Sequence, residues 1–438
     1  MIETYNKLLG LRKICRNCLL LLLCIAWLPA IGQKFNSDTL KLTLPELEKT
    51  FLEKNLQLIA QKYNVDATKA LILQAKLYSN PNINVSNVLY NTETHQWLPT
   101  GKVTGEEAAQ LTQLIILSRK VNKQVKIAET NYKIAEHTFY SVLLSLRYAL
   151  RTSYLDLYHL EKTAEVYDEE INTLKTINNA YKEQEGKGYI AEADVVRIQA
   201  QLYALQNEYQ VLVDSINDQQ SQVRLLLRAT PTTYLKPLED TTSINAGNPL
   251  AYSLSQLLDS ANKNRTDLLL AEDNLVLSQQ NYSYEKAMSV PDLSVSAGYD
   301  KNGSYIPNYN YIGLGIDIPI FNRNQGNIKN AYILQDYNKT QVEITKRNVE
   351  EQVTRGLQKA VDADKLYRGM DPGFASHFDK LAKAMADNYM KRDVKLLDFL
   401  TFYDSYKQNI VQLNTIMFNR ESALESLNFL TGTNLYNK

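Results

Sequence analysis

Two segments in the second half of the chain alternate between apolar and small or polar side chains. One face of the segment 311–320 carries only branched aliphatic residues: Ile312, Leu314, Ile316, Ile318 and Ile320. The positions between them are Tyr, Gly, Gly, Asp and Pro, and the segment 293–299 alternates in the same way. Because successive side chains on a strand point to opposite faces, both segments are predicted to be β-strands. Together they predict a β-hairpin over about residues 291–322.

Most of the remaining sequence has the pattern of long helices. From residue 119 to about residue 185 there is no proline or glycine, which predicts a helix of roughly 65 residues and roughly 100 Å. The stretch "EQEGKGYIAEADV" then predicts a tight turn into a second helix. Downstream of Asp194, apolar residues recur at intervals of three and four: Val195, Ile198, Leu202, Leu205, Tyr209, Leu212 and Ile216. This heptad spacing predicts an antiparallel coiled-coil hairpin.

The chain contains an internal duplication. The segment "PDLSVS", which begins at Pro291, repeats "PNINVS", which begins 210 positions earlier at Pro81. At an offset of 204, the turn at Gly188 aligns with Arg392, and a second heptad follows Asp398 in the same phase. The aligned seam residues are Phe399, Phe402, Tyr406, Asn409, Leu413, Ile416 and Arg420. Two unrelated helices would seldom share both a turn and a phase, so the two halves are predicted to be copies.

Each copy is predicted to contain a helix, a β-hairpin and a coiled-coil hairpin. The first repeat spans 33–229, with its β-hairpin at about 81–118 and its coiled-coil hairpin at 119–229. A linker at 230–249 leads to the second repeat, 250–438, with a β-hairpin at about 291–322 and a coiled-coil hairpin at 323–430. The first β-hairpin alternates less regularly, and a bulge is predicted near Asn87. The segment "YRGMDPGF" at 367–374 is predicted to interrupt the long helix of the second repeat.

Composition excludes several classes of protein. Lysine plus arginine and aspartate plus glutamate number 48 each, so the chain lacks the basic surface typical of nucleic-acid binding. A charged fraction of 22% excludes a helical membrane protein with many spans. Tyrosine is abundant, with 29 copies. Because its ring has an apolar body and a polar end, tyrosine suits a surface that is partly wet and partly apolar.

The N-terminal segment has the features of a cleaved secretory signal peptide, residues 1–32. Several basic residues precede the apolar run "CLLLLLCIAWLPAIGQ", and Ala30 and Gly32 provide small residues before the cleavage point. The run is too short for a membrane anchor. All three cysteines lie in this segment, so the mature chain would hold no disulfide and no cysteine metal site. Leu23 is too large for the position before a lipidated cysteine, so Cys24 is not expected to carry lipid.

Secretion and strand pattern together favour a membrane β-barrel. About ten residues of alternation are typical of a transmembrane β-strand, although an amphipathic hairpin covering a core shows the same pattern. Four strands from one chain cannot close, and open strand edges in lipid leave unpaired N–H and C=O groups. Other copies must therefore complete the barrel, and three copies would supply twelve strands. The face at Ile312, Leu314, Ile316 and Ile318 is predicted to contact lipid.

With these parts in place, the chain resembles the outer-membrane efflux protein family, the TolC-like channel-tunnels. The resemblance covers both repeats and rests on "LTLPELEKTFLEKN", "NPNINVS", "VPDLSVSAGY" and "IPIFNRNQGNIKNA" and on the turn before Asp194. The stretch "AAQLTQLIILSRKVNKQVKIAE" is most similar to the cation-efflux branch, although Ser118 replaces that branch's usual glycine. The resemblance implies a homotrimer with a twelve-stranded barrel in the outer membrane and an α-helical tunnel across the periplasm. It also implies an open periplasmic tip that docks an adaptor (membrane fusion) protein and an inner-membrane pump.

Charged residues near the two tight turns are candidates for a gate at the periplasmic tip. In this hypothesis polar contacts between neighbouring hairpins hold the tip closed, with Lys187 and Arg197 on one hairpin. The other hairpin supplies Asp387, Arg392, Asp393 and Lys395. Gly188 is a further candidate at the tip, because it forms the tight turn of the first hairpin. For Asp194 and Asp398 the simpler role is to stabilise the positive end of a helix dipole.

No catalytic or cofactor motif is present in the sequence. The four histidines, His95, His137, His159 and His377, lack metal-ligand spacing and are expected at the surface or in loops, and the pair Glu169–Glu170 is expected on a solvated helix face. An enzyme is therefore not expected, nor any cofactor or metal. The alternatives are a periplasmic coiled-coil adaptor, which would carry one hairpin and a lipoyl-like module, or a coiled-coil adhesin. The cargo stays open among metal cations, drugs and, as in type I secretion, polypeptides.

Overall fold

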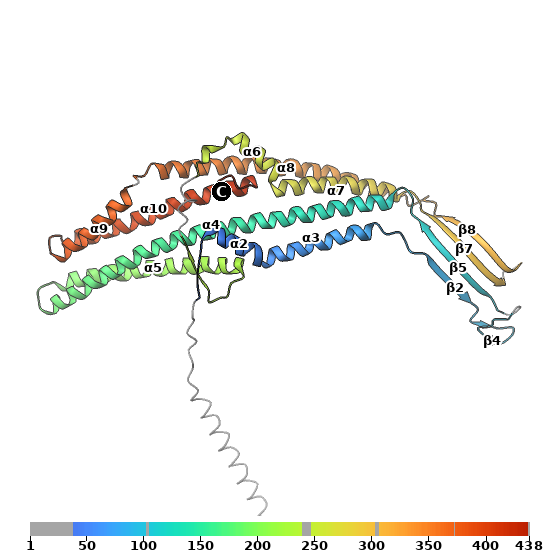
Figure 1. Ribbon diagram of the computed structural model, residues 1–438, viewed down its shortest axis with the longest axis horizontal. Coiled ribbons are helices and arrows are strands. Elements are labelled where there is room, and N and C mark those ends of the chain that lie inside the picture. Colours follow the sequence, from blue (N-terminus) through green and yellow to red (C-terminus); the bar gives the residue numbers. More distant parts are fainter. Residues whose placement is uncertain (1–37, 102–104, 239–246, 303–305, 372, 437–438) are drawn as a thin grey trace, which may run out of the picture.

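The computed structural model describes residues 38–101, 105–238, 247–302, 306–371 and 373–436. The predicted signal peptide and all three cysteines lie outside the described residues. The described chain is long and narrow, with a β-sheet at one end and the tips of two helical hairpins at the other (Figure 1). The predicted fold class, mainly helical with long helices and a four-stranded sheet, is confirmed.

The two halves of the chain contain corresponding helices. The first half contains α2 (Leu44–Lys54), α3 (Leu56–Ala75), α4 (Lys120–Gly186) and α5 (Glu192–Leu227). The second half contains α6 (Leu254–Asn264), α7 (Thr266–Met288), α8 (Gln325–Arg368), α9 (Phe374–Met390) and α10 (Leu396–Thr431). The helix predicted to begin near residue 119 is α4, which runs for 67 residues without interruption. The predicted break within 367–374 separates α8 from α9.

The predicted heptad lies in the contact between α4 and α5. Ile198, Leu202 and Leu205 are buried there against Ile171 and Leu174 of α4. The same apolar cluster includes Tyr389 of α9 together with Phe399, Leu400 and Tyr403 of α10. One continuous core therefore joins the first hairpin, α4–α5, to the second hairpin, α9–α10.

The helix predicted to open each repeat is broken into two. Asn55 separates α2 from α3, and its side-chain oxygen accepts hydrogen bonds from the backbone N–H groups of Gln57, at 3.0 Å, and Leu58, at 3.1 Å. Arg265 separates α6 from α7. The two residues are 210 positions apart, which is the offset of the duplication in this part of the sequence. The break is therefore a shared feature of the two copies.

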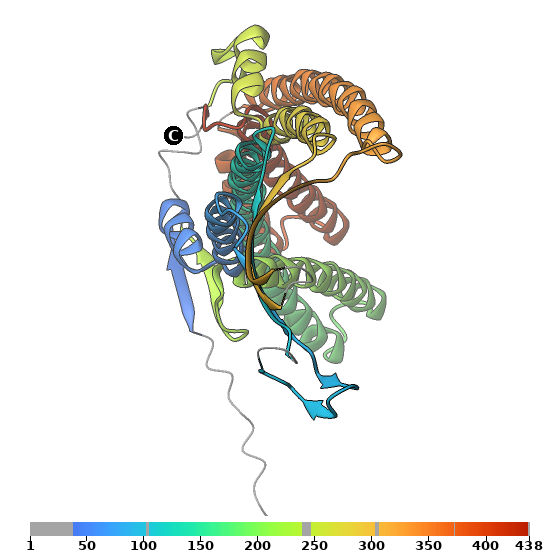
Figure 2. The same cartoon turned by 90° about the vertical axis from the view of Figure 1, so that its right-hand side faces the viewer.

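The segment predicted to be only a linker also contributes a strand. Its residues include β6 (Tyr234–Pro237), which pairs in parallel with β1 (Thr39–Leu42). Neither strand is predicted from the sequence, because four residues are too few to show a period. The pair lies near the middle of the long axis, beside α2, where it forms a small layer against the helices (Figures 1 and 2).

The sheet at the far end is antiparallel throughout, in the order β2-β5-β7-β8. Its strands are β2 (Asn82–Asn87), β5 (Glu107–Ile115), β7 (Leu293–Asn302) and β8 (Pro307–Ile316). The central contact between β5 and β7 joins the two repeats. The sheet is curved when viewed along the long axis (Figure 2).

Two details of the predicted strands are wrong. The bulge near Asn87 is absent, because β2 pairs with β5 in unbroken register and ends at Asn87. A small hairpin of β3 (Tyr90–Asn91) and β4 (Gln96–Trp97) follows it. The strand β8 ends at Ile316, so Ile318 and Ile320 lie beyond it. Ile316 pairs with Leu293, the first residue of β7, so β8 ends where its partner strand begins.

Within the described residues, no helix combines the length and the apolar character needed to cross a membrane.

Candidate functional site: a two-faced sheet and two hairpin tips

The register of the sheet brings apolar side chains from all four strands to one face. Leu293, Val295 and Ala297 of β7 lie opposite Ile316, Leu314 and Ile312 of β8. Across the other two strands this face continues through the following residues: Ile83, Val85, Ala109, Leu111 and Ile115. Ile312 is 82% exposed and Leu314 is 73% exposed. Gln113, opposite Val295, interrupts this face, but most of its side chains are apolar and are left exposed by the described part of the chain.

The opposite face of the sheet is polar and packed closely by small residues. Ser294 donates a hydrogen bond to the carbonyl oxygen of Gly315 at 3.1 Å. A β-carbon added to Gly313 would lie 2.6 Å from the hydroxyl oxygen of Ser296. The ring of Tyr311 lies directly over Gly298 on the neighbouring strand, in space that a side chain would occupy. Glycine therefore permits Ser and Tyr to cover the backbone on this face.

The register also settles the orientation of the first strand pair. Asn82, Asn84 and Ser86 of β2 lie opposite Thr112, Gln110 and Ala108 of β5, on the polar face. The sequence left this orientation open because β2 and β5 alternate irregularly.

Both outer strands of the sheet have an open edge. β2 pairs only with β5, and β8 pairs only with β7, among the residues that the structure describes. An open edge presents unpaired N–H and C=O groups that can pair with a strand of another chain. Because β2 and β8 stand at opposite edges, a second copy can add its β8 beside this chain's β2.

The two hairpin tips share an unusual backbone conformation. Gly188, between α4 and α5, has φ of +77°, and Arg392, between α9 and α10, has φ of +69°. The predicted alignment of these two residues therefore corresponds to a common turn, although only one is glycine. The guanidinium group of Arg392 donates a hydrogen bond to the side-chain oxygen of Gln184 near the end of α4. The two tips thus touch within one chain.

Among the residues that it describes, the structure pairs only one of the remaining candidate gate residues with an opposite charge. Asp194 and Asp398 lie in the first turns of α5 and α10. Lys187 forms an ion pair with Glu183 of its own helix, at 2.5 Å. Four further candidate side chains form no ion pair within the described part of the chain: Arg197, Asp387, Asp393 and Lys395. A single chain therefore does not assemble the charged contacts predicted for the closed tip.

A buried charged cluster at the contact between the hairpins was not predicted. Glu170 of α4 is 2% exposed, and its Oε2 atom has no hydrogen-bond partner. Burial raises the pKa of Glu170 to about 8, an effect that Lys407 opposes and that Asp404 and Glu208 reinforce. Lys407 of α10 lies 2.7 Å from Glu208 of α5 and 3.1 Å from Asp404. The prediction that Glu170 lies on a solvated face is therefore wrong.

Two histidines also differ from the prediction of surface or loop positions. His159 of α4 is buried, with its Nε2 atom 2.9 Å from Glu421 of α10. His137, half-buried on α4, lies 2.5 Å from Asp273 of α7. Each histidine joins α4 to a helix of the other repeat. The described residues contain no group of three or more His, Cys, Asp or Glu side chains that could hold a metal ion.

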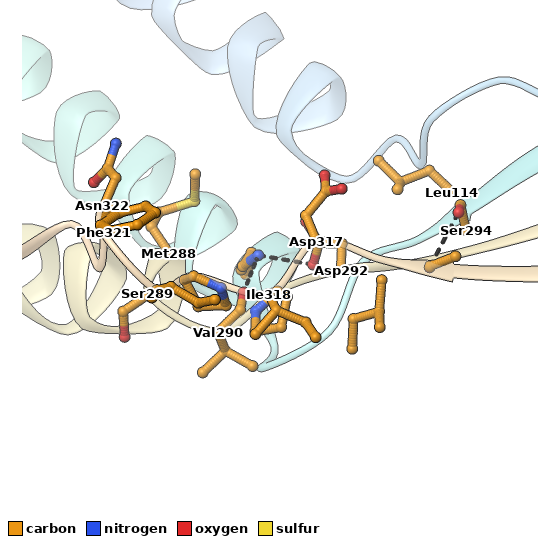
Figure 3. Close-up of a pocket in the computed structure, with 16 residues that line it drawn as sticks. Leu114, Met288, Ser289, Val290, Asp292, Ser294, Asp317, Ile318, Phe321 and Asn322 are labelled. Carbon is orange, nitrogen blue, oxygen red and sulfur yellow. Dashed lines mark hydrogen bonds and ion pairs between the residues drawn. The ribbon is translucent and has the colours of Figure 1, made fainter.

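A cavity of 670 Å³ lies where the sheet meets the helices (Figure 3). Leu114, Ser294 and Gly315 line it, so it opens beside the polar face of the sheet. Lys120, which is 5% exposed, places its ammonium 2.7 Å from a carboxylate oxygen of Asp292. The same oxygen accepts the backbone N–H of Leu117 at 2.8 Å. This ion pair fixes the start of α4 to the residue that precedes strand β7 of the other repeat.

Comparisons with solved structures reveal the same fold in outer-membrane channels. The chain is similar to the Campylobacter jejuni CmeC outer membrane channel, with a TM-score of 0.72 and 15% identity over 90% of this chain and 86% of that one. CusC gives a TM-score of 0.70 and 15% identity over 92% and 96%. The open state of the Neisseria gonorrhoeae MtrE outer membrane channel gives 0.67 and 18% over 90% of each chain. No family model and no curated protein matches the sequence.

These matches cover nearly the whole of both chains. The sheet and the long helices of this protein therefore share the fold of the TolC-like outer-membrane channels. The likeness shows the shared fold and does not resolve the cation-efflux branch, because the three structures match to a similar degree.

Proposed function

We propose that this protein is the outer-membrane channel of a tripartite efflux system and acts as a passive exit duct. The observation that carries the proposal is the sheet with one exposed apolar face, one polar face and two open edges. That sheet stands at the end of two long coiled-coil hairpins, as in the solved channels that share the fold. A periplasmic adaptor built on one coiled-coil hairpin would have no use for such a sheet.

The open edges support a homotrimer. Each unpaired backbone group in lipid costs several kcal/mol, so β2 of one copy must pair with β8 of another until the sheet closes. Three copies supply twelve strands, with the apolar face toward outer-membrane lipid and the Ser and Gly face toward a water-filled pore. In this arrangement α3, α4, α5 and α7 to α10 extend through the periplasm as a tunnel.

The orientation of the sheet can be tested by matched substitutions on its two faces. Leu314→Arg places a charge on the lipid face and should cost about 2–4 kcal/mol if the residue lies near the middle of the bilayer. Thr112→Arg, on the polar face, would point into water and should assemble normally. The measurement is the amount of heat-modifiable trimer in outer-membrane fractions. Equal assembly of both variants would contradict the lipid-facing assignment and, with it, the barrel.

The charged residues at the tip support a gate formed between copies. Asp387, Arg392, Asp393 and Lys395 on one hairpin would pair with Lys187 and Arg197 on a neighbour, because those charges do not pair with one another inside one chain. Surface ion pairs are individually worth about 0–1 kcal/mol, which suits contacts that a docking partner must break. Neutralising Asp387, Arg392 and Asp393 together should raise the single-channel conductance in a planar bilayer. Unchanged conductance with normal trimers would place the gate elsewhere.

The partners in this proposal are an adaptor protein at the tip and an inner-membrane pump. Exposed apolar side chains at the tips, Tyr189, Met390 and Leu397, support an adaptor contact there. Cross-linking in cells followed by isolation of the trimer tests the partner and identifies the pump. A cation-exporting pump would support the cation-efflux branch, and a pump of type I secretion would make polypeptides the cargo.

A further inference from the structure

A cleft between α4 and α7, close to the sheet, is lined by three cations. Its volume is 490 Å³. The lining residues are Arg119, Asn122, Lys123, Lys126, Val276, Gln279, Gln280 and Ser283. None of them is acidic, and the two glutamines and the asparagine add amide N–H groups that can donate hydrogen bonds. The cleft therefore has the composition of an anion site.

The positions of the three cationic side chains cannot be attributed to stabilisation of the helix α4 on which they lie. Arg119 is the N-cap of α4, and the first turn of that helix contains no acidic residue. Cations near a helix N-terminus oppose the helix dipole, so local structure disfavours them. Lys120 in the same turn is compensated by Asp292, but the three cations of the cleft form no ion pair among the described residues. Lys123 donates a hydrogen bond to the Ser283 hydroxyl, at 2.5 Å.

The side of α4 on which the cleft opens follows from helix geometry. Lys120 lines the cavity beside the polar face of the sheet. Each residue of an α-helix turns by about 100°, so Asn122 lies about 200° and Lys126 about 240° around the axis from Lys120. These residues therefore face away from that cavity and from the polar face beside it, on the side that carries the apolar face of the sheet. Lys123 lies between the two sides, toward α7, where Ser283 accepts its hydrogen bond.

The cleft also lies close to the end of the apolar face. That face ends at Ile115, Leu293 and Ile316, and α4 begins at Lys120. With a rise of 1.5 Å per residue, Lys126 is roughly 10 Å further along the helix than Arg119. The headgroup layer on each side of a bilayer has a thickness of roughly this order. Lysine and arginine side chains at this depth can extend their charged ends to lipid headgroups.

We propose that this cleft binds the phosphate of a phospholipid headgroup in the periplasmic leaflet of the membrane. The inference rests on the proposed outer-membrane function. Arg119, Lys123 and Lys126 supply charge-assisted hydrogen bonds to the phosphate oxygens, and Gln279 and Gln280 donate to the glycerol or headgroup oxygens. Val276, which is 42% exposed, provides apolar contact beside them. The bound lipid would hold the junction of sheet and helices at a fixed depth in the membrane.

The test is native mass spectrometry of the intact trimer with added phosphatidylglycerol, with diacylglycerol as the lipid that lacks a phosphate. The variant Arg119→Gln/Lys123→Gln/Lys126→Gln should bind phosphatidylglycerol at least about tenfold more weakly, because charged hydrogen bonds are lost. Lys162→Gln/Lys175→Gln/Lys182→Gln removes the same charge from exposed positions further along α4 and should bind like the parent. Equal binding by both triple variants would overturn the proposal.

Further measurements distinguish lipid binding from a failure of the triple variant to assemble, from binding of any small anion and from a cleft that faces the pore. Lys126→Glu changes one exposed residue, and reduced phosphatidylglycerol binding by its trimers would support the site if the triple variant fails to assemble. Displacement of the lipid by millimolar inorganic phosphate would overturn the lipid assignment in favour of a simple anion site. A change of ion selectivity in planar bilayers, without lost lipid, would overturn it in favour of a pore-facing cleft. Failure of the parent to form trimers or conduct ions would instead refute the proposed channel function.

Discussion

The two coiled-coil hairpins have the same plan but achieve their stability differently. In the first hairpin α4 is continuous, and the seam with α5 is made mainly of aliphatic side chains such as Ile198 and Leu205, both fully buried. In the second hairpin the long helix is interrupted between α8 and α9, and the seam positions of α10 include Phe399, Tyr406 and Asn409. The phase of the heptad has been kept while its chemistry has changed. Duplication therefore preserves the backbone plan more strictly than the packing.

Aromatic residues make the second hairpin depend on the first. The rings of Tyr389 and Phe399 stack with centroids 4.3 Å apart, and Tyr389 also stacks on Tyr181 of α4 at 5.7 Å. Phe399 packs in turn against Tyr403. The aromatic contacts within the tip half of the second hairpin thus extend to α4 through Tyr181, whereas α4 and α5 pack on each other through aliphatic side chains. Because the two hairpins are packed differently, equivalent substitutions in them should lower the free energy of unfolding by unequal amounts.

The largest expected difference is at one pair of equivalent seam positions. Leu205 is fully buried, and Leu205→Ala should reduce the free energy of unfolding by about 2–5 kcal/mol through lost burial and a cavity. Asn409, at the corresponding position, is only half-buried and donates a hydrogen bond to the carbonyl of Ser405 at 2.7 Å. Asn409→Ala should therefore cost about 1 kcal/mol or less. Unfolding of the detergent-purified protein followed by circular dichroism checks both, and equal losses would contradict the proposed difference.

The contact between the hairpins should respond to pH through Glu170. The folded-state pKa of about 8 lies above the ordinary value of 4.5, so the folded protein binds a proton that the unfolded chain releases between these values. Stability should therefore fall as pH rises from about 4.5 to about 8, with a slope of at most about 1.4 kcal/mol per pH unit. Glu170→Gln should remove this dependence and be more stable than the parent at pH 8.

Glu169→Gln is the matched control for this prediction, because the neighbouring Glu169 is exposed. It should keep the parent's pH dependence. Thermal unfolding at several pH values, followed by circular dichroism, distinguishes the three proteins. A parent whose stability does not change between pH 5 and pH 8 would show that Glu170 is ionised in the folded state, with Lys407 supplying the compensation.

The sequence predicts the features of this molecule that repeat over many residues. The seam of α5 and the alternating faces of β7 and β8 can be read directly, because each residue adds to one period. The break at Asn55 has a weaker local signal, an asparagine suited to capping a helix. The pairing of β1 with β6 has none, since four-residue strands nearly 200 positions apart show no period.

The candidate sites likewise include features that the sequence predicts from local spacing and features that depend on contacts between distant segments. The apolar face at Ile312, Leu314 and Ile316 follows from local alternation, but its continuation through Ile83 and Leu111 needs the register of β2, β5 and β7. The burial of Glu170 depends on Lys407 of α10, more than 230 positions away. Partners at that separation are fixed by how the helices pack, and no spacing within α4 indicates them.

Substitutions in the turns at the two tips should have smaller effects on stability, and they also test how the two hairpins differ. A β-carbon on Gly188 would meet no neighbour within 4 Å, so Gly188→Ala should lose stability only through the left-handed backbone, by about 1–2 kcal/mol. Arg392 already bears that strain, so Arg392→Gly should relieve it and offset the lost hydrogen bond to Gln184. The free energies of unfolding should therefore fall for the first variant and stay equal or rise for the second. A loss of 1 kcal/mol or more in Arg392→Gly would give its side chain a structural role.

The smallest expected effects are at Asp194 and Asp398, which occupy the same position in the two repeats. Each carboxylate lies in the first turn of its helix and should stabilise the positive end of the dipole by about 0.3–1 kcal/mol. Asp194→Asn and Asp398→Asn should therefore reduce the free energy of unfolding by similar small amounts. Because these charges are near the surface, about 1 M salt should screen the difference from the parent. If Asp398→Asn also raises the planar-bilayer conductance while Asp194→Asn does not, the dipole cannot be its whole role. Asp398 would then join the charges that hold the tip closed, and the gate would belong mainly to the second hairpin, the one that relies on its neighbour for packing.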